Sequence, residues 1–394
     1  MPFSFFIIII LFIKEVISVV TIKEVKTKKE IKEFVNFPLN LYKDSPYFVP
    51  ELYGEEIALF KDSNIYNETC DQVFYLAYNE NNEVVGRIQG IIQRQYNEIH
   101  NEKRVRFSRF DSIDDTNVSS ALFSAVENWA KEKGMDKFCG PLGYSDLERE
   151  GMLIEGFDEM STFEEQYNYD YYQKLTEDYG FTKEVDWVES RLTYNPDYYE
   201  KIERLTDIVM KRYNLHVVDK ERHESKSHFV DRVAPGFFEL LDSAYAKLYG
   251  VVPFTDKMKK SIMADFKLIL DPKYILIIND ENEKTVAFGL CFPALGDALL
   301  HTGGKLTIRT LLKILNAVKH PKAADLGLIA CDFDYLNKGI IAPIVKKVMD
   351  LLRDGEVKYV ETNLNLEDNT KIRQVWKYFN ERQHKRRRSF VKDI

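Results

Sequence analysis

The loop Asn337-Lys338-Gly339 places a positive charge and a glycine directly before a predicted helix. The preceding residues, 328–333, are apolar enough for a buried strand, and apolar residues recur at spacings of three and four between 340 and 349. Glycine lets the backbone turn with a positive φ, and the helix directs unpaired N–H groups and the positive end of its dipole into the loop. The loop is therefore suited to bind a phosphate or pyrophosphate. The alternative is a plain strand–turn–helix connection, because a single glycine is not specific.

Four glutamates are candidates for acid–base chemistry. Glu148, Glu150 and Glu155 lie in an irregular segment after a predicted short strand at residues 137–140, where one of them could act as a general base. The alternative for each is a solvated loop carboxylate. Glu361 lies on a predicted strand, where a carboxylate needs a partner, so either a function or a buried ion pair accounts for it.

Cysteine and histidine usage argues against a metal site. The four cysteines are Cys70, Cys139, Cys291 and Cys331. They form no C-x-x-C pair, which fits a reducing cytoplasm and neither a disulfide framework nor a zinc site. His216, His223 and His228 follow one another at irregular spacings. We therefore predict no metal.

Length and charge set further limits. The chain has 394 residues, 45% of them hydrophobic, so two domains with sizeable cores are expected. Its net charge of −8 argues against a general nucleic-acid binder. The basic run QHKRRR at residues 383–388 is expected to be an exposed last strand. The functional alternative for this run is attraction of anionic phosphates or lipid headgroups.

The N-terminus carries an apolar stretch at residues 3–13, too short for a membrane span of about 20 residues. It also lacks a basic region and a cleavage site typical of a signal peptide. Three interpretations remain: a short membrane-surface anchor, a helix docked on the body, or an upstream extension from a wrong start codon. We favour the extension, because a strand at residues 19–25 begins a self-contained domain.

The remaining elements follow from periodicity and turn residues. In the first half, a helix at 28–37 is expected to end at Pro38, and a glycine ends each of two later helices. The expected first-half elements are strands at 73–78, 84–93 and 105–110 and helices at 118–133 and 169–179. The expected second-half elements are helices at 235–248, 256–268, 305–318 and 370–379 and strands at 274–279, 286–292 and 357–363. The order of elements therefore repeats.

That order resembles the GNAT (Gcn5-related) N-acyltransferase fold, present twice in tandem. Several phrases resemble a bacterial branch of this family that includes bacterial ceramide synthases. These are Val85-Gly86-Arg87-Ile88, Phe110 to Asp115, Gly140-Pro141, Tyr167-Asn168 with Tyr171-Tyr172, and Gly180-Phe181. The resemblance implies an α/β (α+β) protein with two GNAT-like domains, each a mixed, mostly antiparallel central sheet flanked by helices. The expected divisions are an extension at 1–18, domains at 19–195 and 229–394, and a connector at 196–228.

The resemblance also implies that acyl-CoA is held by its pyrophosphate at a loop between a strand and a helix. In the first half this loop carries Asp114 and Asp115, which would repel a pyrophosphate. In the second half Lys338 and Gly339 match the family pattern, while Leu336 and Ile341 do not. We therefore expect acyl-CoA in the second half. The cofactor-binding residues predicted there are Asn337, Lys338, Gly339, Ile340 and Asn369.

Asn369 fits a family asparagine near the start of the last helix, but the tyrosine expected seven residues later is Trp376. The first half instead offers the pair Tyr171 and Tyr172. The predicted catalytic residues are accordingly Tyr171, Tyr172, Glu148 and Glu361. Either the two halves share a site across an inter-domain cleft, or catalysis has been lost.

The resemblance implies a cytoplasmic N-acyltransferase that moves an acyl group from acetyl-CoA or a longer acyl-CoA to an amine. Its acceptor is expected to be a small-molecule or lipid amine, with no nucleic acid and no metal. Weak contact with a membrane surface remains a further expectation, for example through the apolar N-terminal stretch. The alternative is a catalytically inactive tandem GNAT-fold protein that binds a ligand or partner.

Overall fold

A computed structural model describes residues 20–394 of the chain. The predicted N-terminal extension, residues 1–18, lies outside the described residues. Within the described residues, no helix is long and apolar enough to cross a membrane.

The first half builds its sheet and helices in the expected order. Its strands are β1 (Thr21–Glu24), β2 (Cys70–Tyr78), β3 (Val84–Gln93), β4 (Arg104–Ser112), β5 (Lys137–Gly140), β6 (Met152–Glu155) and β7 (Thr182–Thr193). Its helices are α1 (Lys28–Leu41), α2 (Tyr53–Ala58), α3 (Arg94–His100), α4 (Thr116–Glu132) and α5 (Tyr171–Asp178). Because side chains alternate along β2, Phe74 and Leu76 pack in one cluster with α1 while Ala77 packs in another with α4. The two helices therefore cover opposite faces.

The second half repeats this plan after an additional helix, α6 (Pro196–Arg212). Its strands are β8 (His216–Val217), β9 (Ile275–Asn279), β10 (Thr285–Pro293), β11 (Ala323–Cys331), β12 (Tyr359–Thr362), β13 (Asn365–Leu366) and β14 (Asn380–Asp393). Its helices are α7 (Lys226–Tyr245), α8 (Asp256–Ile269), α9 (Gly296–Leu299), α10 (Ile308–Lys319), α11 (Ile341–Arg353) and α12 (Thr370–Trp376).

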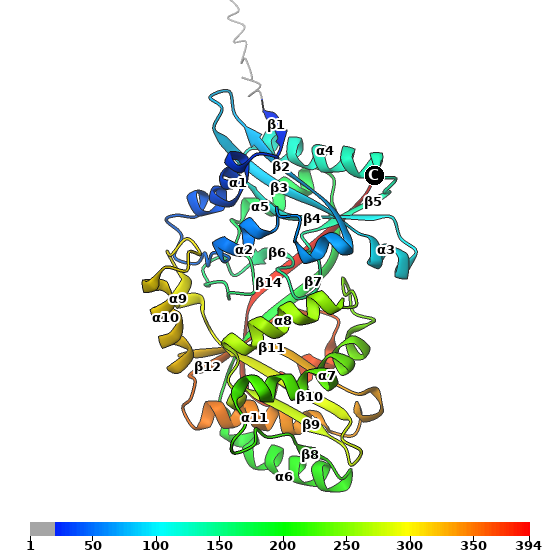
Figure 1. Ribbon diagram of the computed structural model, residues 1–394, viewed down its shortest axis with the longest axis vertical. Coiled ribbons are helices and arrows are strands. Elements are labelled where there is room, and N and C mark those ends of the chain that lie inside the picture. Colours follow the sequence, from blue (N-terminus) through cyan, green and yellow to red (C-terminus); the bar gives the residue numbers. More distant parts are fainter. Residues whose placement is uncertain (1–19) are drawn as a thin grey trace, which may run out of the picture.

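One continuous sheet joins the two halves (Figure 1). Its order is β1-β2-β3-β4-β5-β14-β7-β12-β11-β10-β9-β8, with β13 beside β7 and β6 beside β14. Among residues 20–394, only the pairs β4–β5 and β11–β12 are parallel. This confirms the mixed, mostly antiparallel architecture.

The long strands β7 and β14 cross between the halves (Figure 1). The end of β14 pairs with β5 of the first half, and β7 pairs with β12 of the second half. The last strand of each half, β7 or β14, thus pairs with a strand of the other half. The domain limits along the chain stay a prediction, since the sheet itself has no break between them.

Residues 383–388 form part of the last strand, as expected, but the expectation that this run is exposed is wrong for every residue except Gln383. They lie on β14, in the middle of the sheet, and the side chains of Lys385 and Arg387 are fully buried. Both bind Glu189 of β7, each at 2.6 Å. Burial is tolerated because the carboxylate compensates the two cations.

Two helices continue through a proline, contrary to the predicted boundaries. Helix α1 runs through Pro38 to Leu41. Proline has no N–H to donate to the carbonyl oxygen of Phe34, four residues earlier, but that oxygen accepts a hydrogen bond from Arg87 at 3.2 Å instead. Helix α7 begins at Lys226, nine residues before Pro235. Strand β11 likewise begins earlier than predicted, at Ala323.

Candidate functional site

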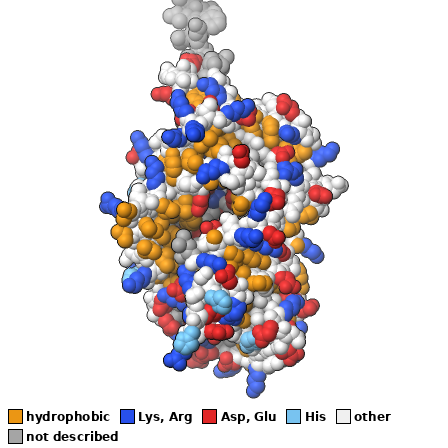
Figure 2. Space-filling model, in the orientation of Figure 1, with side chains coloured by type: hydrophobic (Ala, Val, Ile, Leu, Met, Phe, Trp, Pro, Cys, Tyr) orange, Lys and Arg blue, Asp and Glu red, His pale blue; other side chains and the backbone are white. Residues whose placement is uncertain are grey.

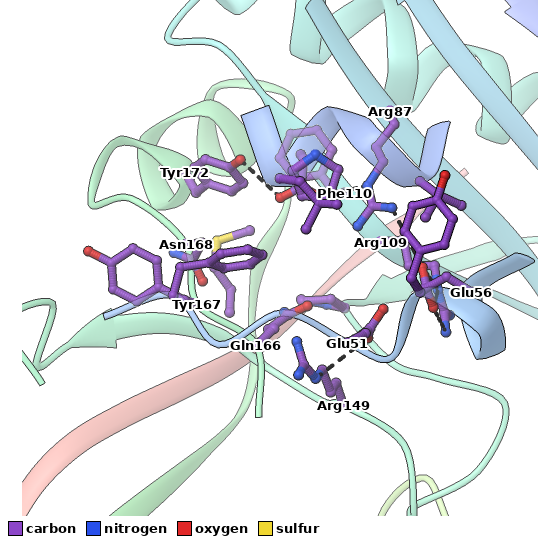
Figure 3. Close-up of a pocket in the computed structure, with 18 of the residues that line it drawn as sticks. Glu51, Glu56, Arg87, Arg109, Phe110, Arg149, Gln166, Tyr167, Asn168 and Tyr172 are labelled. Atoms are coloured by element: carbon purple, nitrogen blue, oxygen red, sulfur yellow. Dashed lines mark hydrogen bonds and ion pairs between the residues drawn. The ribbon is translucent and has the colours of Figure 1, made fainter. Parts of the chain in front are cut away.

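A pocket opens in the first half where β4 and β5 diverge (Figure 3). The two strands pair only at their beginnings, from Arg104 to Arg106 and from Lys137 to Cys139. The polar side chains that line the pocket belong to Glu51, Tyr53, Glu56, Arg87, Arg109, Asp111, Arg149, Gln166, Tyr167, Asn168 and Tyr172. The empty space is about 660 Å³, including the part open to solvent. Gly303 is the second-half residue at its wall.

Strand β4 presents three consecutive side chains to this pocket, those of Arg109, Phe110 and Asp111. An alternating strand would turn the middle one away, but the register with β3 shifts here, because Arg87 faces Asp111 whereas Gln89 faces Ser108. The extra residue forms a β-bulge, and Arg109 has a φ of 46°. The bulge thus turns neighbouring side chains of β4 into one site.

Two glutamates and three arginines form the charged side of the pocket (Figure 3). Arg109 holds both carboxylate oxygens of Glu56, with Nε at 2.9 and 3.2 Å, and Arg87 lies 3.6 Å from Glu56. Burial raises the pKa of Glu56 to about 8, with Arg109 opposing the shift and the Glu51 carboxylate reinforcing it. Burial also acts to raise the pKa of Glu51, but Arg149 and Arg109 outweigh it and lower that pKa to about 2. The pair therefore shares one proton near neutral pH.

A second polar group surrounds Asp111. Its Oδ1 accepts a hydrogen bond from the Tyr42 hydroxyl at 2.9 Å, and its Oδ2 binds Arg87 at 2.7 Å. The Tyr172 hydroxyl lies 2.7 Å from that of Tyr42 and accepts the backbone N–H of Ser112 at 3.1 Å. Burial and the Asp111 charge raise the pKa of Tyr172 well above its usual value, so this hydroxyl keeps its proton.

The other two first-half residues predicted to be catalytic, Tyr171 and Glu148, lie near this site. Tyr171 donates to the Ser112 carbonyl oxygen at 2.8 Å and does not line the pocket. Glu148 lies 3.7 Å from Arg109, so it belongs to the charged group around the pocket. Burial raises the pKa of Glu148, with Arg109 acting in the opposite direction.

Glu361 lies apart from the pocket, on β12 in the second half. It binds Arg191 at 2.7 Å and His384 at 2.6 Å. Burial acts to raise the pKa of Glu361, but the His384 hydrogen bond and nearby cations leave it below its usual value. Of the two explanations open from the sequence, the geometry matches the buried ion pair.

The predicted cofactor loop also lies in the second half, outside the pocket lining. Gly339 has a φ of 81°, and a Cβ there would lie 3.2 Å from Val209 of α6. Lys338 is exposed and places its amino group over the rings of Tyr213 and Tyr335, 5.2 and 4.7 Å from their centroids. Ile340 is buried in the core.

Two helices whose N-termini were considered for cofactor contacts, α12 and α4, are capped by side chains of this chain. Asn369 caps α12, since its Oδ1 accepts the backbone N–H of Ile372 at 3.4 Å. In the first half, Asp115 caps α4 by accepting the N–H of Asn117 at 2.8 Å. Asp114 is exposed beside it. An anion at the first-half loop would therefore meet two carboxylates, as the sequence indicates.

Sequence reasoning missed the charged half of the pocket. Glu51, Glu56, Arg109 and Arg149 were not among the predicted site residues, and they come from two separate stretches, 51–56 and 109–149. The nearest signal was the phrase containing Arg87. No cluster of metal-ligating side chains occurs among residues 20–394.

The fold is that of the tandem GNAT N-acyltransferases. A tandem GNAT protein from the clavulanic acid biosynthesis pathway superposes with a TM-score of 0.55 over 95% of this chain and 98% of that one, at 10% identity. A GCN5-related N-acetyltransferase from Sphaerobacter thermophilus gives a TM-score of 0.51 over 95% of each chain, also at 10% identity. At these identities the likeness shows the fold.

In sequence, the chain is similar to protein YghO of Escherichia coli, with 26% identity over 93% of this chain and 94% of that protein. It is also similar to a bacterial ceramide synthase of Caulobacter vibrioides, with 25% identity over 72% of each. No protein-family model matches the chain.

Proposed function

We propose that the protein is an acyl-CoA-dependent N-acyltransferase whose reaction takes place in the first-half pocket. The observation that carries the proposal is the Glu51–Glu56 pair, buried beside arginines on a bulged β4 of a GNAT fold. The similarity to a ceramide synthase, an enzyme whose product is an amide of a long-chain amine, supports a lipid amine as acceptor.

The reaction forms an amide bond and releases CoA as a thiol. The amine must lose a proton to attack the thioester carbonyl, and Glu56 is the proposed base, since a base works best when its pKa lies near the working pH. The departing thiolate needs a proton or a hydrogen bond. Tyr172 is the proposed hydrogen-bond donor, and Tyr171 and Glu148 are proposed to position the surrounding groups.

The proton shared by the glutamate pair gives a pH signature. The base form of Glu56 exists above its pKa of about 8, so the rate is expected to rise with pH through that value. Glu51→Gln removes the carboxylate that helps raise the pKa of Glu56, so the rise is expected to move to lower pH. The measurement is kcat/KM against pH for both proteins. If kcat/KM depends on pH in the same way in both proteins, the ionisation that controls the rate is not that of Glu56.

The donor site can be tested by calorimetry with CoA, acetyl-CoA and palmitoyl-CoA. We propose that the second-half loop binds the pyrophosphate, so Lys338→Glu is expected to weaken affinity at least tenfold by reversing a charge beside it. The first-half loop follows the pocket strand β4 directly, which makes Asp114→Lys the matched variant. Tighter binding to Asp114→Lys with unchanged binding to Lys338→Glu would move the donor site to the first half.

The second candidate is a tandem GNAT-fold protein that binds a ligand or partner without catalysis. The observations that favour it are the acidic first-half loop and the buried Ile340 and packed Gly339 of the second. Absence of binding to all three CoA compounds would contradict the acyl-CoA-dependent enzyme and favour this alternative.

A further inference from the structure

The outer face of α10 exposes large aliphatic side chains. Leu306, just before the helix, and Ile308, Leu311, Leu312 and Leu315 are 59, 82, 47, 63 and 55% exposed. Figure 2 shows hydrophobic side chains gathered at the edge of the molecule that α9 and α10 occupy in Figure 1. A contiguous apolar surface of this kind marks an interaction site.

The inner face of the same helix already anchors it to the body. Ile314, Ala317 and Val318 pack against a cluster that includes Leu52 and Met160 of the first half. The helix begins with a regular cap, in which Thr307 accepts the N–H of Thr310 at 3.2 Å. The exposed leucines are therefore not needed to hold α10 in place.

The segment that contains α10 is positively charged, although the whole chain carries −8, and the nearest acidic residue in sequence, Asp297 of α9, is paired with Lys322. Residues 298–324 contain no aspartate or glutamate and five basic residues. Three of them, Arg309, Lys313 and Lys319, are exposed and make no ion pair with any other residue of the described range 20–394. Although the chain as a whole is acidic, α10 combines an exposed apolar face with several cations.

We propose that α10 docks the protein on an anionic lipid bilayer. An amphipathic helix with exposed aliphatic residues and flanking Lys and Arg lies in the membrane interface, where apolar burial and attraction to acidic headgroups act together. A second copy of the chain is the less favourable occupant, because a two-fold contact would bring two basic faces together. A bilayer satisfies both the apolar and the positive component.

The helix is linked to the pocket. The segment that precedes it includes Gly303 of the pocket wall, and the backbone N–H of Tyr53 donates to Gly304 at 2.9 Å. A Cβ on Gly304 would lie 1.7 Å from the Glu51 carbonyl oxygen, so glycine permits this contact. Docking would set the pocket beside the bilayer. This inference rests on the proposed N-acyltransferase function and specifies its substrate: the acceptor amine is one embedded in the membrane.

The full chain is tested by sedimentation with vesicles of phosphatidylglycerol and phosphatidylcholine, and with vesicles of phosphatidylcholine alone. We expect binding to the mixed vesicles that falls as salt rises. The double variant Ile308→Asp, Leu312→Asp is expected to lower the partition coefficient at least tenfold, and Arg309→Glu, Lys313→Glu to abolish the preference for anionic lipid. Ile208→Asp is the matched control, since Ile208 is 52% exposed on the distant α6.

Vesicle binding that none of the α10 variants changes would overturn the proposal. Analytical ultracentrifugation of the same proteins identifies a second copy: a wild-type dimer that becomes monomeric in the aspartate variant, with unchanged vesicle binding, would also overturn it. Acylation of a water-soluble amine separates this inference from the proposed function. Vesicle binding lost while that activity is retained supports the docking role, and vesicle binding retained without any activity contradicts only the enzyme assignment.

Discussion

Glu56→Gln is expected to lower kcat for acyl transfer by a factor of about 10² to 10⁴, the contribution typical of a positioned general base. Glutamine keeps the size of the side chain and an oxygen that can accept from Arg109, but it cannot take a proton from the amine. The rise of rate with pH through about 8 is expected to vanish with it. Steady-state kinetics with saturating acyl-CoA measures both effects.

Glu98→Gln is the control, because Glu98 is an exposed first-half glutamate on α3 and does not line the pocket. Its kcat is expected to stay within a factor of about two of wild type. Unfolding curves check that both variants fold. A Glu56→Gln protein with full kcat and an unchanged pH profile would assign the base to another group, and Glu148 would be the next candidate because it also lies near Arg109.

Glu189→Gln is expected to lower the free energy of unfolding by about 3–5 kcal/mol, the loss typical when one partner of a buried ion pair is removed. Glu189 is buried and lies 2.6 Å from both Lys385 and Arg387. Its neutralisation leaves the two cations in the middle of the sheet with only Glu165, 3.8 Å from Arg387, as a carboxylate partner. Urea denaturation measures the loss. Glu155→Gln is the control, because Glu155 meets Arg386 of the same strand at 3.4 Å but is 61% exposed, so a loss of at most about 1 kcal/mol is expected.

The same carboxylate predicts a direction for acid unfolding. Burial acts to raise the pKa of Glu189, but Arg387 and Lys385 lower it to about 2. A carboxylate whose pKa is depressed by folding stabilises the protein above its ordinary pKa of 4.5, and this contribution disappears as the pH falls from 4.5 toward 2. The stability difference between wild type and Glu189→Gln is therefore expected to narrow over that interval. A constant difference would mean that the charge of Glu189 does not contribute to the stability of the folded protein.

Much of the local structure could be predicted because its causes are local. Apolar spacing and a glycine stop gave α4 to within two residues, and turn residues gave the hairpins β2–β3 and β9–β10. The repeated order of elements indicated a tandem GNAT fold, which the structural likeness confirms. The helix boundaries predicted at Pro38 and Pro235 were wrong, because both helices continue through the proline. Contacts elsewhere in the fold and the other turns of each helix compensate for the hydrogen bond that proline cannot make.

The candidate site was only half visible for a different reason. Tyr172 lay in a phrase that resembles a family, so its place at the pocket could be anticipated. Glu51 and Glu56, by contrast, are ordinary surface-type residues in a Pro-punctuated stretch, and only the bulge in β4 brings Arg109 to them. The pKa of a carboxyl depends on burial and neighbours that no local pattern encodes.

The sequence by itself therefore determined the type and order of the elements, the repetition of the plan and the acidity of the first-half loop. Only the tertiary structure decided where the last strand goes. QHKRRR reads as an exposed basic strand, yet β14 enters the first half, and Lys385 meets a carboxylate 196 positions earlier in the chain. Local spacing fixes hydrogen bonds within a helix or hairpin, whereas the partner of a buried charge is fixed by how distant strands pair.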